Sequence, residues 1–358
     1  SISLSKYSHN QFKVKIINIC GEWDEYRDIF RKNNVEIQDL SFSYFKYLPK
    51  KGFFQSRFSY FVIFLISFVP LLYLIKKKKP DILIIHLLTS LPLLLLNLFN
   101  FNTKFILRIS GYPKLNFWRK IYWTISLKKV YKITCPTHDL IKQLKDLNIF
   151  ESHKITFLPD AIINIENFRE QIKSKNILKV PKKYFLAVGR LTRQKNFSYL
   201  IDEFMEFSKK NEDINLLIFG EGEQKKELLN KIKIYSLDKR VFLMGHSKKI
   251  YYYMKNASAF ILSSLWEEPG FVIIEAALSN LFIISSDCYN GPKEFLLNGE
   301  AGILFKNNKR GELKKKLEEF SSIKDTNQLK LKKIKAKKNC IKYTMFRHNI
   351  YLKKIISL

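Results

Sequence analysis

The chain has 358 residues, 46% hydrophobic and 15% aromatic, which excludes an intrinsically disordered protein and suffices for two domains with separate cores. Its cysteines are far apart and its histidines show no metal-ligand spacing, which argues against a disulfide framework or a metal site and favours a reducing compartment. The net charge of +31 favours anionic partners such as phosphorylated substrates, anionic lipid or nucleic acid, unless the lysines only solvate the surface.

An apolar segment lies near the start of the chain. The residues from Phe58 to Ile75 carry no charge, and four lysines (Lys76 to Lys79) follow them. Alone, this pattern is that of a marginal membrane span with a basic flank. The segment is short, contains Pro70 and is followed closely by the strand-like run Ile82 to Ile85. We therefore expect a buried or membrane-surface helix rather than a span.

Short apolar runs alternate with helical patterns in the C-terminal half. After the first run, Asn196 is expected to cap a helix whose apolar residues recur in steps of three and four, from Phe197 to Phe207. This alternation predicts a doubly wound parallel sheet. The expected strands are Tyr184 to Val188, Leu216 to Phe219, Val241 to Met244, Ala259 to Leu262 and Leu281 to Ser285.

The N-terminal half follows a similar but noisier pattern. Its expected strands are Val14 to Ile19, Ile82 to Ile85, Phe105 to Ile109, Tyr131 to Thr134 and Ile155 to Leu158. We predict an N-terminal Rossmann-like domain over 1–165, a linker over 166–183 and a second Rossmann-like domain over 184–340. The lysine-rich tail is mostly helical, and 341–358 is expected to return to the first domain. Two such domains create a cleft at the carboxyl ends of their strands, where ligands bind.

The first loop with a chemical signal runs from Gly189 to Asn196, between an expected strand and an expected helix. Arg190 and Lys195 stand in it beside the helix start. Guanidinium, ammonium and helix amides together suit a diphosphate, since each favours negatively charged oxygens. On spacing alone, an ordinary basic loop is an equal alternative.

The second loop, Trp266 to Ala276, follows a later strand. Gly270 is expected to open a helix there and to let a ligand approach backbone amides. Glu267 and Glu275, eight positions apart, can accept hydrogen bonds from vicinal hydroxyls of a sugar. The alternative for Glu275, an acid in an apolar run, is a buried glutamate held by a salt bridge.

Together the segments VGRLTRQKN and EEPGFVIIEA resemble the paired signatures of the retaining GT-B glycosyltransferases known as glycosyl transferases group 1. The resemblance implies an α/β GT-B fold, with two Rossmann-like domains facing across a cleft. It also implies a catalytic set of Arg190 and Lys195, which clamp the donor diphosphate, and Glu267, which contacts the transferred sugar. The implied donor-binding residues are Gly189, Glu275 at the ribose, Gly270, Phe271 and Val272 through their amides, and Val241 and Phe242 beside the base.

The resemblance further implies an enzyme that moves a hexose or N-acetylhexosamine from a nucleotide diphosphate sugar, with UDP favoured, and retains the anomeric configuration. Such enzymes need no metal and no cofactor. The implied acceptor is a glycan or a polyprenyl-diphosphate-linked sugar in cell-surface polysaccharide or lipopolysaccharide biosynthesis. The expected location is cytoplasmic, peripheral to the inner face of the bacterial plasma membrane. The base, the sugar, the acceptor and the oligomeric state stay open.

On the acceptor side, His86 ends a strand-like run, and Ser110 and Gly111 stand where many members of the family have His-Gly. We expect these residues and Arg108 near the acceptor or the sugar. Nothing before Val14 resembles the family's first strand and glycine-rich loop, which predicts a truncated or unusual first domain.

The N-terminal half also suits an anionic membrane surface, because aromatic and basic residues alternate before the apolar segment. The residues are Tyr44, Phe45, Tyr47, Lys50, Lys51, Phe53 and Phe54. The alternative for this segment is core aromatics with solvated lysines. For the whole chain, the net charge of +31 offers a second alternative, a basic nucleic-acid-binding protein without enzymatic activity. Since no helix-turn-helix, RNP, zinc-finger or P-loop pattern occurs, we expect no nucleic acid partner.

Overall fold

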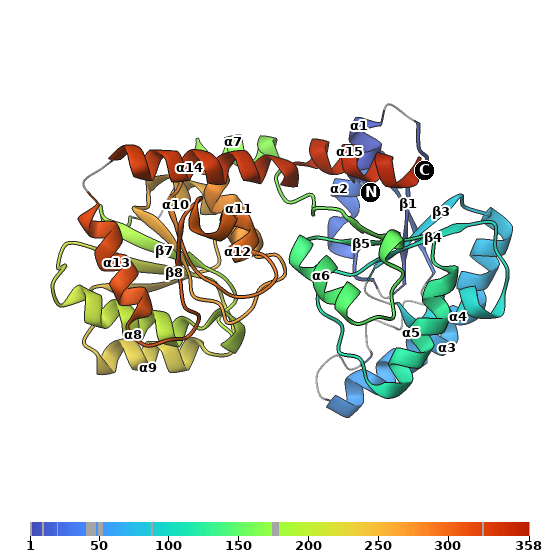
Figure 1. Ribbon diagram of the computed structural model, residues 1–358, viewed down its shortest axis with the longest axis horizontal. Helices are drawn as coiled ribbons and strands as arrows, with labels where there is room; N and C mark the ends of the chain where they lie inside the picture. The colour runs from blue at the N-terminus through green and yellow to red at the C-terminus, as the bar shows by residue number, and fades with distance from the viewer. Residues whose placement is uncertain are drawn as a thin grey trace. The chain divides into compact units, whose positions relative to one another are not determined.

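The computed structural model describes residues 2–8, 11–19, 21–40, 48, 53–86, 89–173, 179–323 and 326–357. The chain forms two compact units (Figure 1). Unit 1 comprises Ser1–Pro136, Leu140–Pro159 and Met345–Leu358, and unit 2 comprises Thr137–Asp139 and Asp160–Thr344. Helix α15 (Met345–Ile356) is thus part of the unit that contains the N-terminus: Ser3 Oγ lies 2.8 Å from His348 Nδ1, and Ser8 Oγ donates to Asn349.

The sheets of unit 1 are parallel. Strands β1 (Lys15–Asn18) and β2 (Glu36–Asp39) pair, and β3 (Ile82–Ile85), β4 (Lys104–Arg108), β5 (Lys132–Cys135) and β6 (Ile155–Phe157) form a four-stranded sheet in chain order. The other elements are α1 (Ile2–Tyr7), η1 (Asp24–Tyr26), α2 (Arg27–Lys32), α3 (Phe53–Lys78), α4 (Ser90–Leu98), α5 (Phe117–Lys129), α6 (His138–Asp146) and η3 (Ser152–Lys154).

Helices cover both faces of the four-stranded sheet. In β4, Phe105 and Leu107 pack with α3, α4, α5 and α6, whereas Ile106 packs with α1 and α15. Neighbouring residues of a strand point to opposite faces, so a strand covered on both sides is apolar at consecutive positions. This explains why the middle of β4, Phe105 to Leu107, is apolar at three consecutive positions and shows no alternation.

The described part of unit 2 holds a six-stranded parallel sheet in the order β12-β11-β10-β7-β8-β9. Its strands are β7 (Tyr184–Val188), β8 (Asn215–Phe219), β9 (Val241–Gly245), β10 (Ala259–Leu262), β11 (Ile283–Ser286) and β12 (Ile303–Phe305). Its helices are α7 (Ile165–Ile172), η4 (Arg193–Lys195), α8 (Phe197–Ser208), α9 (Lys225–Ile234), α10 (Ile250–Asn256), α11 (Phe271–Leu278), α12 (Pro292–Phe295), η5 (Leu297–Gly299), α13 (Glu312–Ser322), α14 (Thr326–Cys340) and η6 (Ile341–Tyr343).

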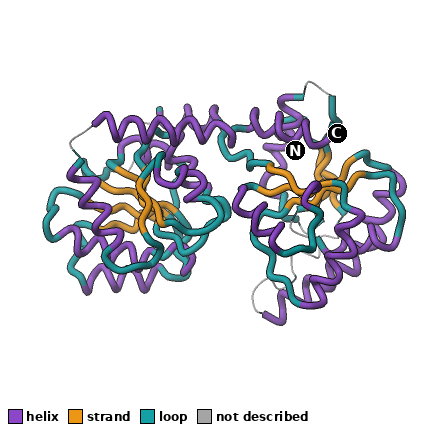
Figure 2. The backbone as a smooth tube through the Cα atoms, in the orientation of Figure 1, coloured by secondary structure: helices purple, strands orange, loops and turns teal. Residues whose placement is uncertain are grey.

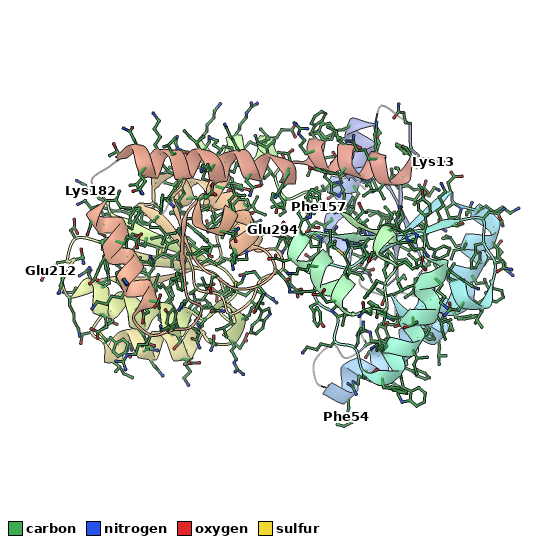
Figure 3. All side chains as sticks on the ribbon, viewed as in Figure 1. Lys13, Phe54, Phe157, Lys182, Glu212 and Glu294 are labelled. Carbon is green, nitrogen blue, oxygen red and sulfur yellow. The ribbon has the colours of Figure 1, made fainter. Side chains whose placement is uncertain are left out.

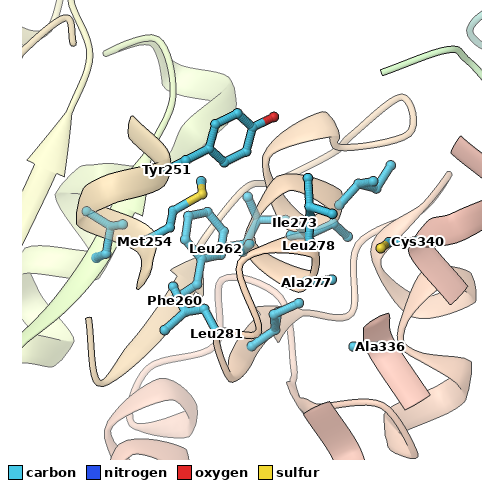
Figure 4. Close-up of a cluster of buried hydrophobic side chains, with 14 of the residues drawn as sticks. Tyr251, Met254, Phe260, Leu262, Ile273, Ala277, Leu278, Leu281, Ala336 and Cys340 are labelled. Carbon is cyan, nitrogen blue, oxygen red and sulfur yellow. The ribbon is translucent and has the colours of Figure 1, made fainter. Parts of the chain in front are cut away.

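This sheet is also enclosed between two helix layers, as the tube drawing shows (Figure 2). One core cluster joins Phe260 and Leu262 of β10 to Tyr251 of α10, Ile273 of α11 and Ala336 of α14 (Figure 4). The other joins the alternate strand residues to α8, α9 and α13. The predicted apolar face of α8 is confirmed, because its five residues are at most 2% exposed: Phe197, Leu200, Ile201, Phe204 and Phe207.

The structure confirms the doubly wound α/β class and every strand expected from the sequence, within a few residues at the ends. Two strands, β2 and β12, were not expected. Asn196 does stand at the N-cap of α8, but it has φ of 53° and makes no capping hydrogen bond with its side chain. Its Nδ2 donates instead to Asn308 Oδ1 at 3.0 Å, so this side chain ties two loops together.

The boundary between the units differs from the expected linker at 166–183. Helix α7 lies within that range and packs on α10, with the rings of Phe168 and Tyr251 5.1 Å apart. The second unit therefore begins at Asp160, and the return to unit 1 begins at Met345 rather than at 341 because Tyr343 is buried against Phe295.

Helix α3 contains the apolar segment. Residues Arg57–Lys78 are long and apolar enough to cross a membrane, and 28% of an 18-residue apolar window within them is buried. Leu71, Leu74 and Ile75 are buried in the core of unit 1, so one face of α3 packs on the unit. Of the aromatic and basic residues expected before it, Tyr44, Phe45, Tyr47, Lys50, Lys51 and the side chain of Phe53 lie outside the described residues.

Candidate functional site

The strand order of unit 2 contains a switch point between β7 and β10. From β7 the chain adds β8 and β9 on one side, and then returns to add β10, β11 and β12 on the other side. Consecutive connections leave in opposite directions there, and open parallel sheets bind ligands at such a switch point, at the carboxyl ends of the strands. The two loops that carried the chemical signals follow these two strands.

Glycines close the loop that follows β7. Gly189 N donates to Phe219 O at 2.9 Å, and a Cβ on Gly189 would lie 3.1 Å from the side-chain carbons of Lys195. Gly220 has φ of 146°, and a Cβ there would lie 1.9 Å from Gly189 O. Only glycine fits at position 220, and the stem of Lys195 lies over the Gly189 backbone.

Lys195 and Glu267 meet across the switch point. Lys195 Nζ donates to Glu267 Oε1 at 2.5 Å, and Ser264 Oγ donates to the same oxygen at 2.5 Å. The exposed fractions of the Lys195 and Glu267 side chains are 13% and 5%. In this state the ammonium compensates a carboxylate that is almost completely buried, as such a group requires.

Two cations of this loop stay available, Arg193, which is exposed, and Arg190. Arg190 is also exposed, and its guanidinium makes no hydrogen bond or ion pair with any residue that the structure describes. Two buried polar atoms, Thr192 Oγ1 in the same loop and Asn290 Oδ1 in the loop after β11, likewise find no hydrogen-bond partner among the described residues. Buried polar atoms in native proteins are normally paired, so the Thr192 hydroxyl can donate a hydrogen bond to a ligand or water, and Asn290 Oδ1 can accept one.

The loop after β10 ends at the first turn of α11. Gly270 is the N-cap residue, with φ of 85° in the left-handed region. The amides of Phe271 and Val272 follow it, and first-turn amides have no acceptor within the helix. Gly291, from the loop after β11, has φ of 150°, and a Cβ there would lie 2.0 Å from Pro269 O. A third loop therefore supports the second at close range.

Glu275 stands one turn into α11. Burial raises the pKa of Glu275 to about 7, and a hydrogen bond from the phenol of Tyr251 opposes that rise. Tyr251 is buried in the core on the α10 side. The carboxyl thus changes its charge close to neutral pH. Among the described residues its partner is a neutral donor, and none of them forms the salt bridge considered as an alternative.

The candidate residues in unit 1 lie at the carboxyl ends of its strands. His86 directly follows β3, Arg108 ends β4, and Ser110 and Gly111 come two and three residues later. Arg108 is 6% exposed, and its guanidinium donates to Leu158 O at 2.6 Å, which ties the ends of β4 and β6 together. Arg108 therefore has a structural bond within unit 1.

The structure differs from one expectation, that Val241 and Phe242 lie beside the base. Val241 and Phe242 begin β9, and the strand runs four residues further to Gly245 before its carboxyl end. At ~3.3 Å per residue, Val241 lies roughly 13 Å from the edge where the loops meet. Its side chain is also buried in the core. The strand end at Gly245, whose carbonyl accepts from Gly220 N, is the part of β9 at this edge.

The sequence analysis did not predict two residues that contact the site. Ser264 contacts Glu267 from the start of the same loop, and Tyr251 contacts Glu275 from another helix. Ser264 lies in a Ser-Ser pair directly after a strand, a weak signal for a loop hydrogen bond. Tyr251 stands in a run of three tyrosines, and no pattern distinguishes it from its neighbours.

Residues 168–342 match a family model described as glycosyl transferases group 1. This part of the chain belongs to that family. An uncharacterised glycosyltransferase of Methanocaldococcus jannaschii is 32% identical in an alignment of length 246 that covers 63% of this chain and 60% of that one. The UDP-Gal:alpha-D-GlcNAc-diphosphoundecaprenol alpha-1,3-galactosyltransferase of Escherichia coli is 30% identical over 178 residues, 46% of this chain and 44% of that one.

A solved structure of a glycosyltransferase from Rickettsia africae has the same fold. It superposes with a TM-score of 0.78 at 19% identity and covers 99% of this chain and 93% of that one. The GT-B fold expected for the chain is thereby confirmed. The chain spans less than two thirds of the length of either curated relative.

Among the described residues, no group of three or more His, Cys, Asp or Glu side chains could hold a metal ion. The expectation that catalysis needs neither a metal nor a cofactor stays a prediction. The described cysteines Cys135, Cys288 and Cys340 are free and buried.

Proposed function

We propose that the protein is a glycosyltransferase that moves a hexose or N-acetylhexosamine from a UDP-sugar to an acceptor hydroxyl with retention of configuration. The observation that carries the proposal is the pair Lys195–Glu267 at the switch point of unit 2, beside the exposed guanidinium of Arg190. The two cations, Arg190 and Lys195, together with the amides of a helix start, form the arrangement that a diphosphate requires.

In the proposed reaction, the bond between the anomeric carbon and the diphosphate oxygen breaks, and the acceptor oxygen forms the new bond on the same face. The acceptor proton passes to the leaving diphosphate. Negative charge develops on the departing oxygen, and Arg190 and Lys195 stabilise it. When the diphosphate binds, Lys195 shares its donors between the phosphate and Glu267, which frees that carboxylate to accept from a hydroxyl of the transferred sugar.

Glu275 binds the ribose in this proposal. A carboxylate accepts hydrogen bonds from two vicinal hydroxyls, so the ionised form is the one that binds. The hydrogen bond from Tyr251 favours that form. The amides of Phe271 and Val272 serve the sugar or the phosphate, and the carboxyl end of β9 borders the base.

The proposed acceptor is a glycan or a polyprenyl-diphosphate-linked sugar, in cell-surface polysaccharide or lipopolysaccharide biosynthesis. The name of the Escherichia coli relative, with its UDP donor and lipid-linked acceptor, supports this choice. His86, Ser110 and Gly111 lie at the strand ends of unit 1 and are proposed to contact the acceptor. The protein then works in the cytoplasm, peripheral to the inner face of the plasma membrane.

A thermal-shift screen with UDP, GDP, ADP and CMP tests the donor site. A ligand that binds only the folded chain raises the melting temperature as its concentration grows. We expect a rise with UDP and little with the others, and a smaller rise in Arg190→Met and Glu275→Gln. If the melting temperature rises only with another nucleotide, the proposed donor base changes from uracil to the base of that nucleotide. No rise with any of them, in a folded chain, would contradict the proposed donor site.

A further inference from the structure

Helix α3 presents an apolar face outward from unit 1. Phe58, Phe61, Leu65 and Val69 follow one another in steps of three and four, and they are 63%, 57%, 54% and 68% exposed. This is the spacing of one helix face. Figure 3 shows Phe54 at the end of the helix where α3 begins. Large side chains this exposed, and this continuous, are unusual on a protein that meets only water.

Helix α5 adds a second apolar face of the same kind. Trp118, Ile121 and Ile125 are 76%, 41% and 55% exposed, again at helical spacing. Both helices pack on α4. Burial is the main reason why the pKa of Tyr122 of α5 is raised to about 12, and the neighbouring Tyr60 of α3 also raises it. The two faces therefore belong to neighbouring helices on one side of unit 1, where Figure 1 shows α3, α4 and α5 together.

Charge around these faces is of one sign. The 99 residues from Leu40 to His138 contain sixteen Lys or Arg and a single acid, Asp81. This quarter of the chain thus carries +15 of the total +31. Exposed lysines stand at the end of α3, from Lys76 to Lys79, and on α5, at Lys120 and Lys128. With one acid in 99 residues, this segment offers its cations few acidic partners, and it suits an anionic surface.

We propose that the α3–α5 face, defined by Phe58, Phe61, Leu65, Val69, Trp118, Ile121 and Ile125, binds the surface of a bilayer that contains anionic lipid. Apolar side chains enter the interface while the flanking lysines attract the headgroups. Helix α3 lies on the membrane and does not cross it, because Leu71, Leu74 and Ile75 stay packed in the core of unit 1.

The chain connects this face to the proposed acceptor side. The loop after β4, with Ser110 and Gly111, runs directly into α5, which begins at Phe117. An acceptor whose sugar is linked to a membrane lipid is thereby presented beside that loop. This use of the face rests on the proposed function, whereas the binding to lipid does not.

Vesicle co-sedimentation tests the face. The full chain is mixed with vesicles of phosphatidylglycerol and phosphatidylcholine, or of phosphatidylcholine alone, at about 0.05 M and about 0.5 M salt, where the screening length falls from roughly 14 to roughly 4 Å. We expect binding to the anionic vesicles, weakened at high salt and at least about tenfold weaker on neutral vesicles.

The variant Val69→Asp with Trp118→Asp is expected to lower binding to anionic vesicles at least about tenfold, because it removes apolar contact and adds negative charge. The matched control is Ile234→Asp, on the 76% exposed Ile234 of α9 in unit 2, which should bind as the unchanged protein does. Circular dichroism confirms that each variant is folded.

Equal binding by the double variant and the control would overturn the proposal. A lack of vesicle binding by the unchanged chain would also overturn it, as would binding that appears only with RNA present. Resistance to carbonate extraction would indicate a membrane span and would overturn it too. The UDP thermal shift is measured on the same variants. If UDP raises the melting temperature but the chain does not bind vesicles, only this inference is contradicted. If the chain binds vesicles but UDP does not raise the melting temperature, only the proposed donor site is contradicted.

Discussion

The ammonium of Lys195 lies 2.5 Å from the carboxylate of Glu267, although the two residues are 72 positions apart in the chain. They come from loops after two strands that are neighbours in the sheet but not in sequence. The pair is thus a product of the strand order. It holds both side chains largely out of water at the place where the donor phosphates are proposed to bind.

Breaking this pair from one side is expected to destabilise unit 2. Lys195→Met leaves Glu267 buried without its cation, at a cost of about 3 kcal/mol in the free energy of unfolding. The double variant Lys195→Met with Glu267→Gln removes both charges and keeps the hydrogen bond from Ser264. It should return to within about 1 kcal/mol of the unchanged protein in urea denaturation.

The matched control for that prediction is the exposed pair Lys209–Glu206, which is 2.9 Å long. Lys209→Met should change the free energy of unfolding by less than about 0.5 kcal/mol, because water screens an exposed pair. If Lys195→Met costs no more than Lys209→Met, the buried pair is not a stabilising contact.

Arg190→Met is expected to weaken UDP binding by about tenfold to a hundredfold and to leave the melting temperature of the free protein unchanged. Arg190 is exposed and has no described partner to lose, whereas a charged hydrogen bond to phosphate is strong. Titration calorimetry measures the affinity. Arg193→Met, the same change three residues later, is the control, and equal losses in both variants would point to general charge rather than to a clamp.

Gly291→Ala tests the support of the second loop. The added Cβ would lie 2.0 Å from Pro269 O, so the loop that carries Gly270 must shift. We expect a loss of stability above about 2 kcal/mol and weaker UDP binding. Gly311→Ala also has positive φ but meets nothing within 4 Å, and should cost only about 1 kcal/mol. Equal costs would show that backbone strain alone matters.

The raised pKa of Glu275 predicts a pH dependence. Its pKa is about 7 in the folded chain against an ordinary value of 4.5, so between these values the folded state holds a proton that the unfolded state has lost. The stability contributed by Glu275 is therefore fully present below pH 4.5 and is lost as the pH rises through 7. Glu275→Gln should flatten the free energy of unfolding across this window in urea titrations.

Tyr251→Phe should move that window upward, because it removes the hydrogen bond that favours the ionised carboxylate. Tyr252→Phe, one position along, is the control and should leave the profile where it is. An unchanged profile in Tyr251→Phe would mean that burial alone sets the charge of Glu275.

Much of this architecture could be predicted from local patterns. Apolar runs such as Tyr184–Val188, followed by helical spacing from Phe197, are properties of neighbouring residues, so they are visible in a single chain. The loops with Arg190 and Glu267 were found because charged residues directly follow buried strands. Strand β12, of three residues, was missed, although the equally short strand β6 was expected.

The contacts that complete the site depend on the order of the strands. No spacing predicts that Lys195 bonds Glu267 or that Tyr251 reaches Glu275, because both pairs join separate elements. The direction of β9 misled for the same reason: Val241 marks the strand, but the sheet places its other end, Gly245, at the site edge.

The most direct test of the account is calorimetric titration of UDP into the unchanged protein and into the double variant Lys195→Met with Glu267→Gln. The account predicts one UDP per chain for the unchanged protein, and a loss of at least about tenfold, or about 1.4 kcal/mol, in the folded double variant. A folded double variant that binds UDP as tightly as the unchanged protein would contradict a diphosphate site at Lys195.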